Sequence, residues 1–178
     1  MRWLRLRSVW LLVIPFLWLA RPTAGLLLLG GVLALLGLAL RGWAAGVIRK
    51  ERELTVHGPY AYTRNPLYLG SLLLGLGVVA AGGRWIFLPL FLLFFALVYG
   101  RTIRGEEAIL LRQFGEPYRD YVQSVPLLLP RLAPYRPSGE APPLPRFSLA
   151  RYRKNREWEA VLGVVAGFGF LAAKLFLR

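Results

Sequence analysis

The stretch HGPYAYTRNPLYLGSLLLGLG, residues 57–77, begins with polar and turn-forming residues and ends as an apolar run. Its two dipeptides Gly58-Pro59 and Asn65-Pro66 are turn signals, and proline suits the first turn of a helix, where no backbone donor is needed. The stretch therefore predicts a helix that begins near Leu67 and ends at the Ala-Gly-Gly sequence of residues 81–83. Polar side chains are gathered just before this apolar helix, where a purely structural apolar segment does not require them.

The chain as a whole is also apolar. Of its 178 residues, 56% are hydrophobic, and the mean hydropathy is +0.48, whereas soluble domains are about 45–50% apolar. The excess falls in long blocks, which indicates a membrane protein. The apolar segments run over about Val9–Ala20, Ala24–Val47, Leu67–Gly83, Trp85–Tyr99 and Ala160–Leu177. We expect an all-α polytopic bundle of about five transmembrane helices.

The first of these segments is open to two interpretations. A basic start followed by an apolar run is also typical of a signal peptide. The sequence has no clear small-residue cleavage site, however, and the second segment follows almost at once after the turn signal Arg21-Pro22. A tight helical hairpin is therefore the preferred interpretation.

The charges predict an orientation in the membrane. With the N-terminus in the cytoplasm and five crossings, nearly all of the 23 basic residues and all nine acidic residues fall on the cytoplasmic side. Only Arg21, Arg84, Lys174 and Arg178 remain outside. Such asymmetry is what the positive-inside rule describes, so we expect the N-terminus and any active site to face the cytoplasm.

Composition also limits the partners. The net charge is +14, but aromatic residues do not interleave with the charges as on a nucleic-acid-binding surface, so we expect no nucleic-acid partner. The absence of cysteine excludes disulfides and thiolate catalysis. A single histidine argues against a histidine-based metal site, and we expect no metal.

Two polar constellations lie on the predicted cytoplasmic side. They are RKERELTVHGPYAYTRNPLYLG, residues 49–70, and GRTIRGEEAILLRQFGEPYRDYVQSVP, residues 100–126. One helical hairpin separates them and returns the chain to the same face, so we expect them to meet there. Free N–H groups at a helix start favour an anion, and tyrosine faces suit a heteroaromatic group. The alternative for both is structural: an interfacial aromatic belt, and a surface helix whose acids neutralise arginines.

The proline-rich stretch at residues 126–147 cannot form a regular helix, because it carries seven of the thirteen prolines. We therefore expect a membrane core over residues 1–130, an interfacial proline- and arginine-rich linker over 131–156, and a C-terminal transmembrane helix over 157–178. Two roles remain open for the last helix: it caps the bundle or forms a homodimer contact.

The paired motifs GPYAYTRNPLYLG and EEAILLRQFGEPYRDYVQSVP resemble the membrane methyltransferases related to isoprenylcysteine carboxyl methyltransferase and to phospholipid N-methyltransferases. The resemblance covers roughly residues 25–130. It implies S-adenosylmethionine in a cytosol-facing pocket between helix ends and connecting segments. It also implies a lipophilic, membrane-resident acceptor with a carboxylate or an amine; prenylcysteine, phospholipid amine and isoprenoid acid all remain open.

The resemblance implies a set of site residues as well. The implied cofactor-binding residues are Arg52, Glu53, Leu54, Thr55, Tyr60, Asn65, Pro66, Leu67, Tyr68 and Glu106. The family's arginine before the acids would face an anionic group of the substrate. That position is Thr102 here, so Arg101 or Arg104 must substitute, and Glu107 is the candidate base for an amine acceptor. Asn65 stands where the family usually has histidine.

Two other functions remain as alternatives. Membrane NADPH-dependent reductases of the sterol or steroid type share an Arg-x-Pro-x-Tyr-x-Gly turn. They typically continue with a Lys-Tyr-Gly-x-x-Trp pattern, whereas this chain reads FGEPY at residues 114–118. A non-catalytic lipid-binding membrane protein is the second alternative, which Asn65 and the missing aligned arginine favour.

Overall fold

The computed structural model describes residues 12–49, 53–137 and 147–177, and these residues form helices and connecting segments without a strand. A short helix over residues 12–19 comes first. The further elements are α2 (Ala24–Val47), η1 (Gly58–Ala61), α3 (Pro66–Gly82), α4 (Phe87–Phe114), α5 (Glu116–Ser124), α6 (Leu149–Lys154) and α7 (Trp158–Phe176). The prediction of an all-α fold is confirmed.

Three of these helices, α2, α4 and α7, are long and apolar enough to cross a membrane. The fourth apolar helix, α3, is shorter, with 17 residues. Large apolar side chains such as Leu35, Leu93 and Val165 lie exposed on α2, α4 and α7, as expected of lipid-facing helices. The chain is therefore a membrane protein. Five crossings and the cytoplasmic orientation remain predictions, and part of the first apolar segment lies outside the described residues.

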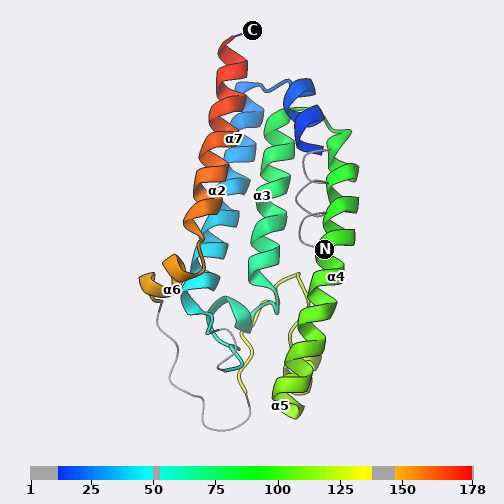
Figure 1. The fold of residues 1–178 in the computed structure, drawn as a ribbon, viewed down its shortest axis with the longest axis vertical. Helices are drawn as coiled ribbons and strands as arrows, with labels where there is room; N and C mark the ends of the chain where they lie inside the picture. The colour runs from blue at the N-terminus through cyan, green and yellow to red at the C-terminus, as the bar shows by residue number, and fades with distance from the viewer. Residues whose placement is uncertain (1–11, 50–52, 138–146, 178) are drawn as a thin grey trace.

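The polar elements gather at one end of the bundle (Figure 1). The ends of α2 and α4, the starts of α3 and α7, and all of η1, α5 and α6 lie there, at the bottom of the view. The opposite end holds the connections at residues 20–23 and 84–86 and the C-terminus. The expected return of the chain through the α3–α4 hairpin thus brings the two polar constellations to the same end.

Helices α2 and α3 pack with their backbones almost touching. A Cβ atom added at Gly30 would lie 2.3 Å from the carbonyl oxygen of Gly77, and one at Gly37 would lie 2.7 Å from that of Gly70. Small residues permit such close approach, which is a common way for helices to associate in lipid. This tight pair is the frame from which the polar end is built.

Helix α4 extends further than its apolar sequence. The apolar segment ends near Tyr99, but the helix continues through Gly105 to Phe114, where Gly115 ends it with a positive φ of 56°. The polar half remains helical because it still buries one side, as Ile103 is only 3% exposed. The extension carries the twin acids Glu106 and Glu107 on a rigid helix.

The segment after α5 folds back onto the turn before α3. The backbone N–H of Arg131 donates to the Tyr62 carbonyl at 2.9 Å, and that of Tyr135 donates to the Ala61 carbonyl at 2.9 Å. No helix forms over the described residues 126–137, as the prolines predict. We call residues 126–135 the strap; it fixes the loop that leads into α3.

Candidate functional site

Two side-chain contacts join the start of α3 to the polar half of α4. Arg64 Nη1 donates to Glu107 Oε1 at 2.6 Å, and the Tyr68 hydroxyl donates to Glu106 Oε1 at 2.8 Å. The predicted meeting of the two polar constellations is therefore present in the structure. We call these four residues the α3–α4 junction.

Helix geometry explains which α4 side chains reach the junction. Residues three and four positions apart share a helix face, so Glu106 and Glu107 lie on the same side as the buried Ile103. Arg101 and Arg104 are exposed, and neither makes an ion pair within the described part of the chain. The arginine that meets the acids is Arg64, from the loop before α3. The substrate-facing role predicted for Arg101 or Arg104 remains a prediction.

The strap holds Arg64 in position. The backbone N–H of Arg64 donates to the Pro126 carbonyl at 3.0 Å. On either side, the Thr63 hydroxyl and the Asn65 amide both donate to the Leu127 carbonyl at 3.2 Å. Asn65 thus uses its side chain to anchor the strap while it occupies the N-cap position of α3.

The Arg64–Glu107 pair is sheltered from water. The exposed fraction is 14% for the arginine side chain and 30% for the glutamate side chain. A charge-assisted hydrogen bond in such a place is stronger than one between neutral groups. Arg64 Nε is buried, and it has no hydrogen-bond partner among the described residues. The guanidinium therefore retains a donor for a further acceptor.

Buried tyrosines form the base of the junction. Val56, Tyr118, Tyr121 and Val125 make a core cluster, and the Tyr121 hydroxyl donates to the Tyr60 carbonyl at 2.6 Å. Burial raises the pKa of Tyr118 and of Tyr121, although nearby Arg64 opposes the shift in both. These phenols remain neutral at physiological pH.

Tyr60 and His57 carry polar atoms that the described residues do not satisfy. Both the Tyr60 hydroxyl and His57 Nε2 are buried without a hydrogen-bond partner there. Burial raises the pKa of Tyr60, and the neighbouring Tyr121 and the Glu106 carboxylate raise it further. Because native buried polar groups are nearly always hydrogen-bonded, each of these two atoms can accept a further partner.

Two hollows open at this end of the molecule. One, of about 390 Å³, lies between α4 and α5; its lining is Arg64, Glu107, Ala108, Leu111, Tyr118, Arg119, Val122 and Gln123. A larger hollow, of about 590 Å³, lies between α5 and the strap, and none of the predicted site residues lines it. Of these two hollows, only the smaller is lined by the Arg64–Glu107 pair.

The remaining predicted residues are placed as follows. Pro66 is buried at the start of α3, and the Leu67 carbonyl accepts a hydrogen bond from Arg41 at 3.2 Å. Glu53 pairs with Arg49 at 3.3 Å, the Thr55 hydroxyl accepts from the Arg49 N–H at 3.3 Å, and Leu54 packs against the tyrosine cluster. Arg52 lies outside the described residues. The roles assigned to all of these residues remain predictions.

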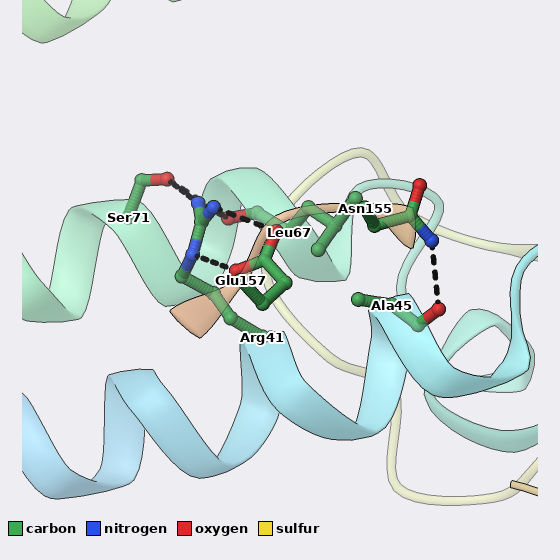
Figure 2. A network of polar contacts seen from close by, with 6 residues as sticks. All are labelled: Arg41, Ala45, Leu67, Ser71, Asn155 and Glu157. Carbon is green, nitrogen blue, oxygen red and sulfur yellow. Dashed lines mark hydrogen bonds and ion pairs between the residues drawn. The ribbon is translucent and has the colours of Figure 1, made fainter. Parts of the chain in front are cut away.

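Sequence reasoning missed a second polar centre (Figure 2). Arg41 of α2 binds Glu157 through two contacts of 2.9 Å, and it also donates to the Leu67 carbonyl and the Ser71 hydroxyl of α3. An arginine inside an apolar segment needs a partner, so the sequence indicated that Arg41 would bind an anionic group. The sequence did not indicate that this group is Glu157, which lies 116 positions away.

A metal centre is not apparent: in the ranges 12–49, 53–137 and 147–177, no group of three or more histidine, aspartate or glutamate side chains converges to hold an ion. The chemistry available at the α3–α4 junction is therefore that of carboxylates, a guanidinium and phenols. These groups bind and orient ligands, and the carboxylates accept protons.

The model of the phospholipid methyltransferase family matches residues 23–117 of this chain, which include α2, α3, α4 and both halves of the junction. No solved structure matches the chain.

Three characterised proteins are similar to parts of the chain. The nickel-cobalt-cadmium resistance protein NccN of Alcaligenes xylosoxydans xylosoxydans is 34% identical over 121 residues, 67% of this chain and 55% of its own. The cobalt-zinc-cadmium resistance protein CzcN of Cupriavidus metallidurans is 36% identical over 121 residues, covering 67% and 54%. The protein-S-isoprenylcysteine O-methyltransferase of Schizosaccharomyces pombe is 35% identical over 81 residues, covering 46% and 34%. The chain thus spans about half the length of the first two relatives.

Proposed function

The chain belongs to the phospholipid methyltransferase family, and from this premise we propose that it transfers a methyl group from S-adenosylmethionine to a lipophilic acceptor held in the membrane. Similarity to the isoprenylcysteine methyltransferase over 81 residues supports the same chemistry. Both observations favour methyl transfer over the reductase alternative. The identities of the acceptor and of the cofactor are the parts of this proposal that go beyond family membership.

The residues at the junction suit S-adenosylmethionine. The ribose hydroxyls and the amino group of the cofactor need acceptors, and Glu106 is an exposed carboxylate already oriented by Tyr68. The carboxylate of the cofactor suits the positive end of a helix dipole, which the start of α3 provides. The Tyr60 hydroxyl, which has no partner among the described residues, is a further donor or acceptor. We propose that these groups hold the cofactor together with Asn65, Pro66, Leu67 and residues 52–55.

When bound, the cofactor supplies a methyl group that its positive sulfur has already activated. The protein's own work is to align the acceptor, exclude water and hold both partners in contact. A carboxylate acceptor needs no base. An amine acceptor must lose a proton, and we propose Glu107 as the carboxylate that receives it.

We propose the hollow between α4 and α5 as the place of the acceptor's reacting end. Its lining combines the Arg64–Glu107 pair with apolar side chains such as Leu111 and Val122, which suits a polar head on an apolar chain. Arg101 and Arg104, exposed on α4, are proposed to meet an anionic acceptor as it approaches. Opposite solubilities imply two entrances, one from the bilayer for the acceptor and one from water for the cofactor.

One observation carries the proposal: Tyr68–Glu106 and Arg64–Glu107 join the two family motifs, and the nearby buried Tyr60 hydroxyl lacks a partner among the described residues. The test is calorimetric titration of the protein in detergent with S-adenosylhomocysteine, the demethylated product of the cofactor. We expect saturable binding that Glu106→Ala weakens by about tenfold or more, because a hydrogen bond to a charged group contributes about 1.5–3 kcal/mol.

Glu116→Ala is the matched control, since Glu116 is an exposed glutamate of α5 that pairs with its neighbour Arg119. It should leave the affinity within about twofold, as expected of a surface ion pair. Absence of saturable binding to the unmodified protein would favour the non-catalytic alternative, and saturable binding of NADPH would favour the reductase. A screen of lipid extracts with a labelled methyl donor then identifies the acceptor.

A further inference from the structure

We infer that Glu157, at the start of α7, is a positioning residue of the cofactor site: through Arg41 it fixes the first turn of α3, which carries Tyr68 and so orients Glu106. The inference rests on the proposed function. It assigns a role in the site to a residue that lies outside the part of the chain matched by the family, residues 23–117.

The link from Glu157 to α3 is a continuous set of hydrogen bonds (Figure 2). Arg41 Nε and Nη2 donate to the two carboxylate oxygens of Glu157, each at 2.9 Å. The remaining terminal nitrogen, Nη1, donates to the Leu67 carbonyl at 3.2 Å and to the Ser71 hydroxyl at 2.5 Å. The planar guanidinium suits such fork-like binding, which lysine cannot reproduce. One side chain of α2 thus connects α7 to the first turns of α3.

The ion pair is well shielded from solvent. The Glu157 side chain is 7% exposed and that of Arg41 is 21% exposed. The arginine's carbon stem is held as well, because a Cβ atom added at Gly70 would lie only 2.5 Å from Arg41 Cγ. Removing one member of such a pair leaves the other charge uncompensated in a poorly solvated place. Without Glu157, we expect the Arg41 guanidinium to move toward another acceptor and to lose its hydrogen bonds to Leu67 and Ser71 of α3.

Leu67 transmits this hold to the junction. Its carbonyl accepts from both Arg41 and the Ser71 hydroxyl, the latter at 3.0 Å. The next residue is Tyr68, whose hydroxyl donates to Glu106 at 2.8 Å. A shift of the Leu67 carbonyl therefore moves the residue that orients the carboxylate proposed to bind the cofactor.

Glu157 is itself held by the turn between α6 and α7, which is docked on the end of α2. The Asn155 amide donates to the Ala45 carbonyl at 2.9 Å, and Arg151 Nε donates to the Gly46 carbonyl at 2.7 Å. These carbonyls belong to the last turn of α2, which has few helical partners of its own. The C-terminal region thus presents Glu157 to Arg41 from a fixed platform.

The test compares two glutamates of the same turn. Glu157→Gln keeps the size and removes the charge, and Glu159→Gln makes the same change in an exposed pair with Arg156. Binding of S-adenosylhomocysteine is measured well below the unfolding temperature of each variant. We expect Glu157→Gln to weaken the affinity by about tenfold and Glu159→Gln to change it by less than about twofold. Unchanged binding in Glu157→Gln would overturn the inference.

A double-mutant cycle with Tyr68→Phe separates positioning from general loosening of the fold. If Glu157 acts through Tyr68, the double variant loses less affinity than the product of the two single losses. Losses that simply multiply would overturn the inference. Should Glu157→Gln fail to fold, Arg41→Met/Glu157→Gln removes both charges and spares the fold, and wild-type affinity in that variant would likewise overturn it. Failure of the proposed function is distinct, because the unmodified protein would then not bind the ligand.

Discussion

Arg64 and Glu107, 43 positions apart in the chain, form an ion pair of 2.6 Å that ties the loop before α3 to the polar half of α4. The pair joins the two sequence motifs GPYAYTRNPLYLG and EEAILLRQFGEPYRDYVQSVP. It also lies at the wall of the α4–α5 hollow. It therefore serves both the fold and the proposed acceptor site, and its removal has consequences for each.

We expect Arg64→Ala to lower the free energy of unfolding by about 1–3 kcal/mol, because it leaves the partly buried Glu107 carboxylate without its partner. Chemical denaturation in detergent measures the change. Arg119→Ala is the control, since its pair with Glu116 is exposed and should contribute less than about 1 kcal/mol. Equal losses in the two variants would show that the junction adds no special stability.

Tyr60→Phe should separate stability from binding. The Tyr60 hydroxyl is buried without a partner among the described residues, so its removal should leave the unliganded protein as stable as before or slightly more stable. The affinity for S-adenosylhomocysteine should fall, by about fivefold or more if one hydrogen bond is lost. Thermal unfolding with and without ligand measures both effects, and a destabilised protein with unchanged affinity would contradict the assignment.

Close packing of α2 on α3 predicts a sharp difference between two glycines. In Gly77→Ala the new Cβ would lie 2.6 Å from the Gly30 carbonyl oxygen, so the helices must separate. In Gly167→Ala of α7 the new Cβ meets nothing within 4 Å. We expect Gly77→Ala to lower the free energy of unfolding by about 1–3 kcal/mol, and Gly167→Ala to be neutral or stabilising, because alanine is the better helix former. Similar results for both would argue against the close α2–α3 contact.

Three buried tyrosines predict how the free energy of unfolding responds to alkaline pH. The pKa values of Tyr60, Tyr118 and Tyr121 lie above the ordinary value of 10.0 in the folded chain, chiefly through burial. Below pH 10 both folded and unfolded chains keep these protons, so their contribution does not vary with pH. Above it the unfolded chain releases protons that the folded chain retains, and stability must fall.

Denaturation curves at rising pH should show this decline, accompanied by delayed appearance of the ultraviolet absorbance of tyrosinate. Tyr60→Phe should make the decline shallower, because one of the retained protons is gone. A full yield of tyrosinate near pH 10 in the folded protein would contradict the burial of these phenols.

Local sequence patterns were enough to predict the all-α membrane class and the gathering of polar residues at one end. Both follow from local properties: apolar runs form helices in lipid, and one hairpin returns the chain to the side it left. The start of α3 at Pro66 and its end before Gly83 were equally readable, because proline and glycine act on their own turns.

The choice of which charges meet came from the tertiary packing. Helical spacing places Glu106 and Glu107 on the face of Ile103, but rotation of α4 about its axis depends on packing. Packing buried Ile103, brought the two acids to Arg64 and Tyr68, and left Arg101 and Arg104 exposed. Likewise, the need of Arg41 for an anion was written in α2, whereas the choice of Glu157 came from how α7 docks. Partners distant in the chain are chosen by three-dimensional packing, which no local pattern of residues encodes.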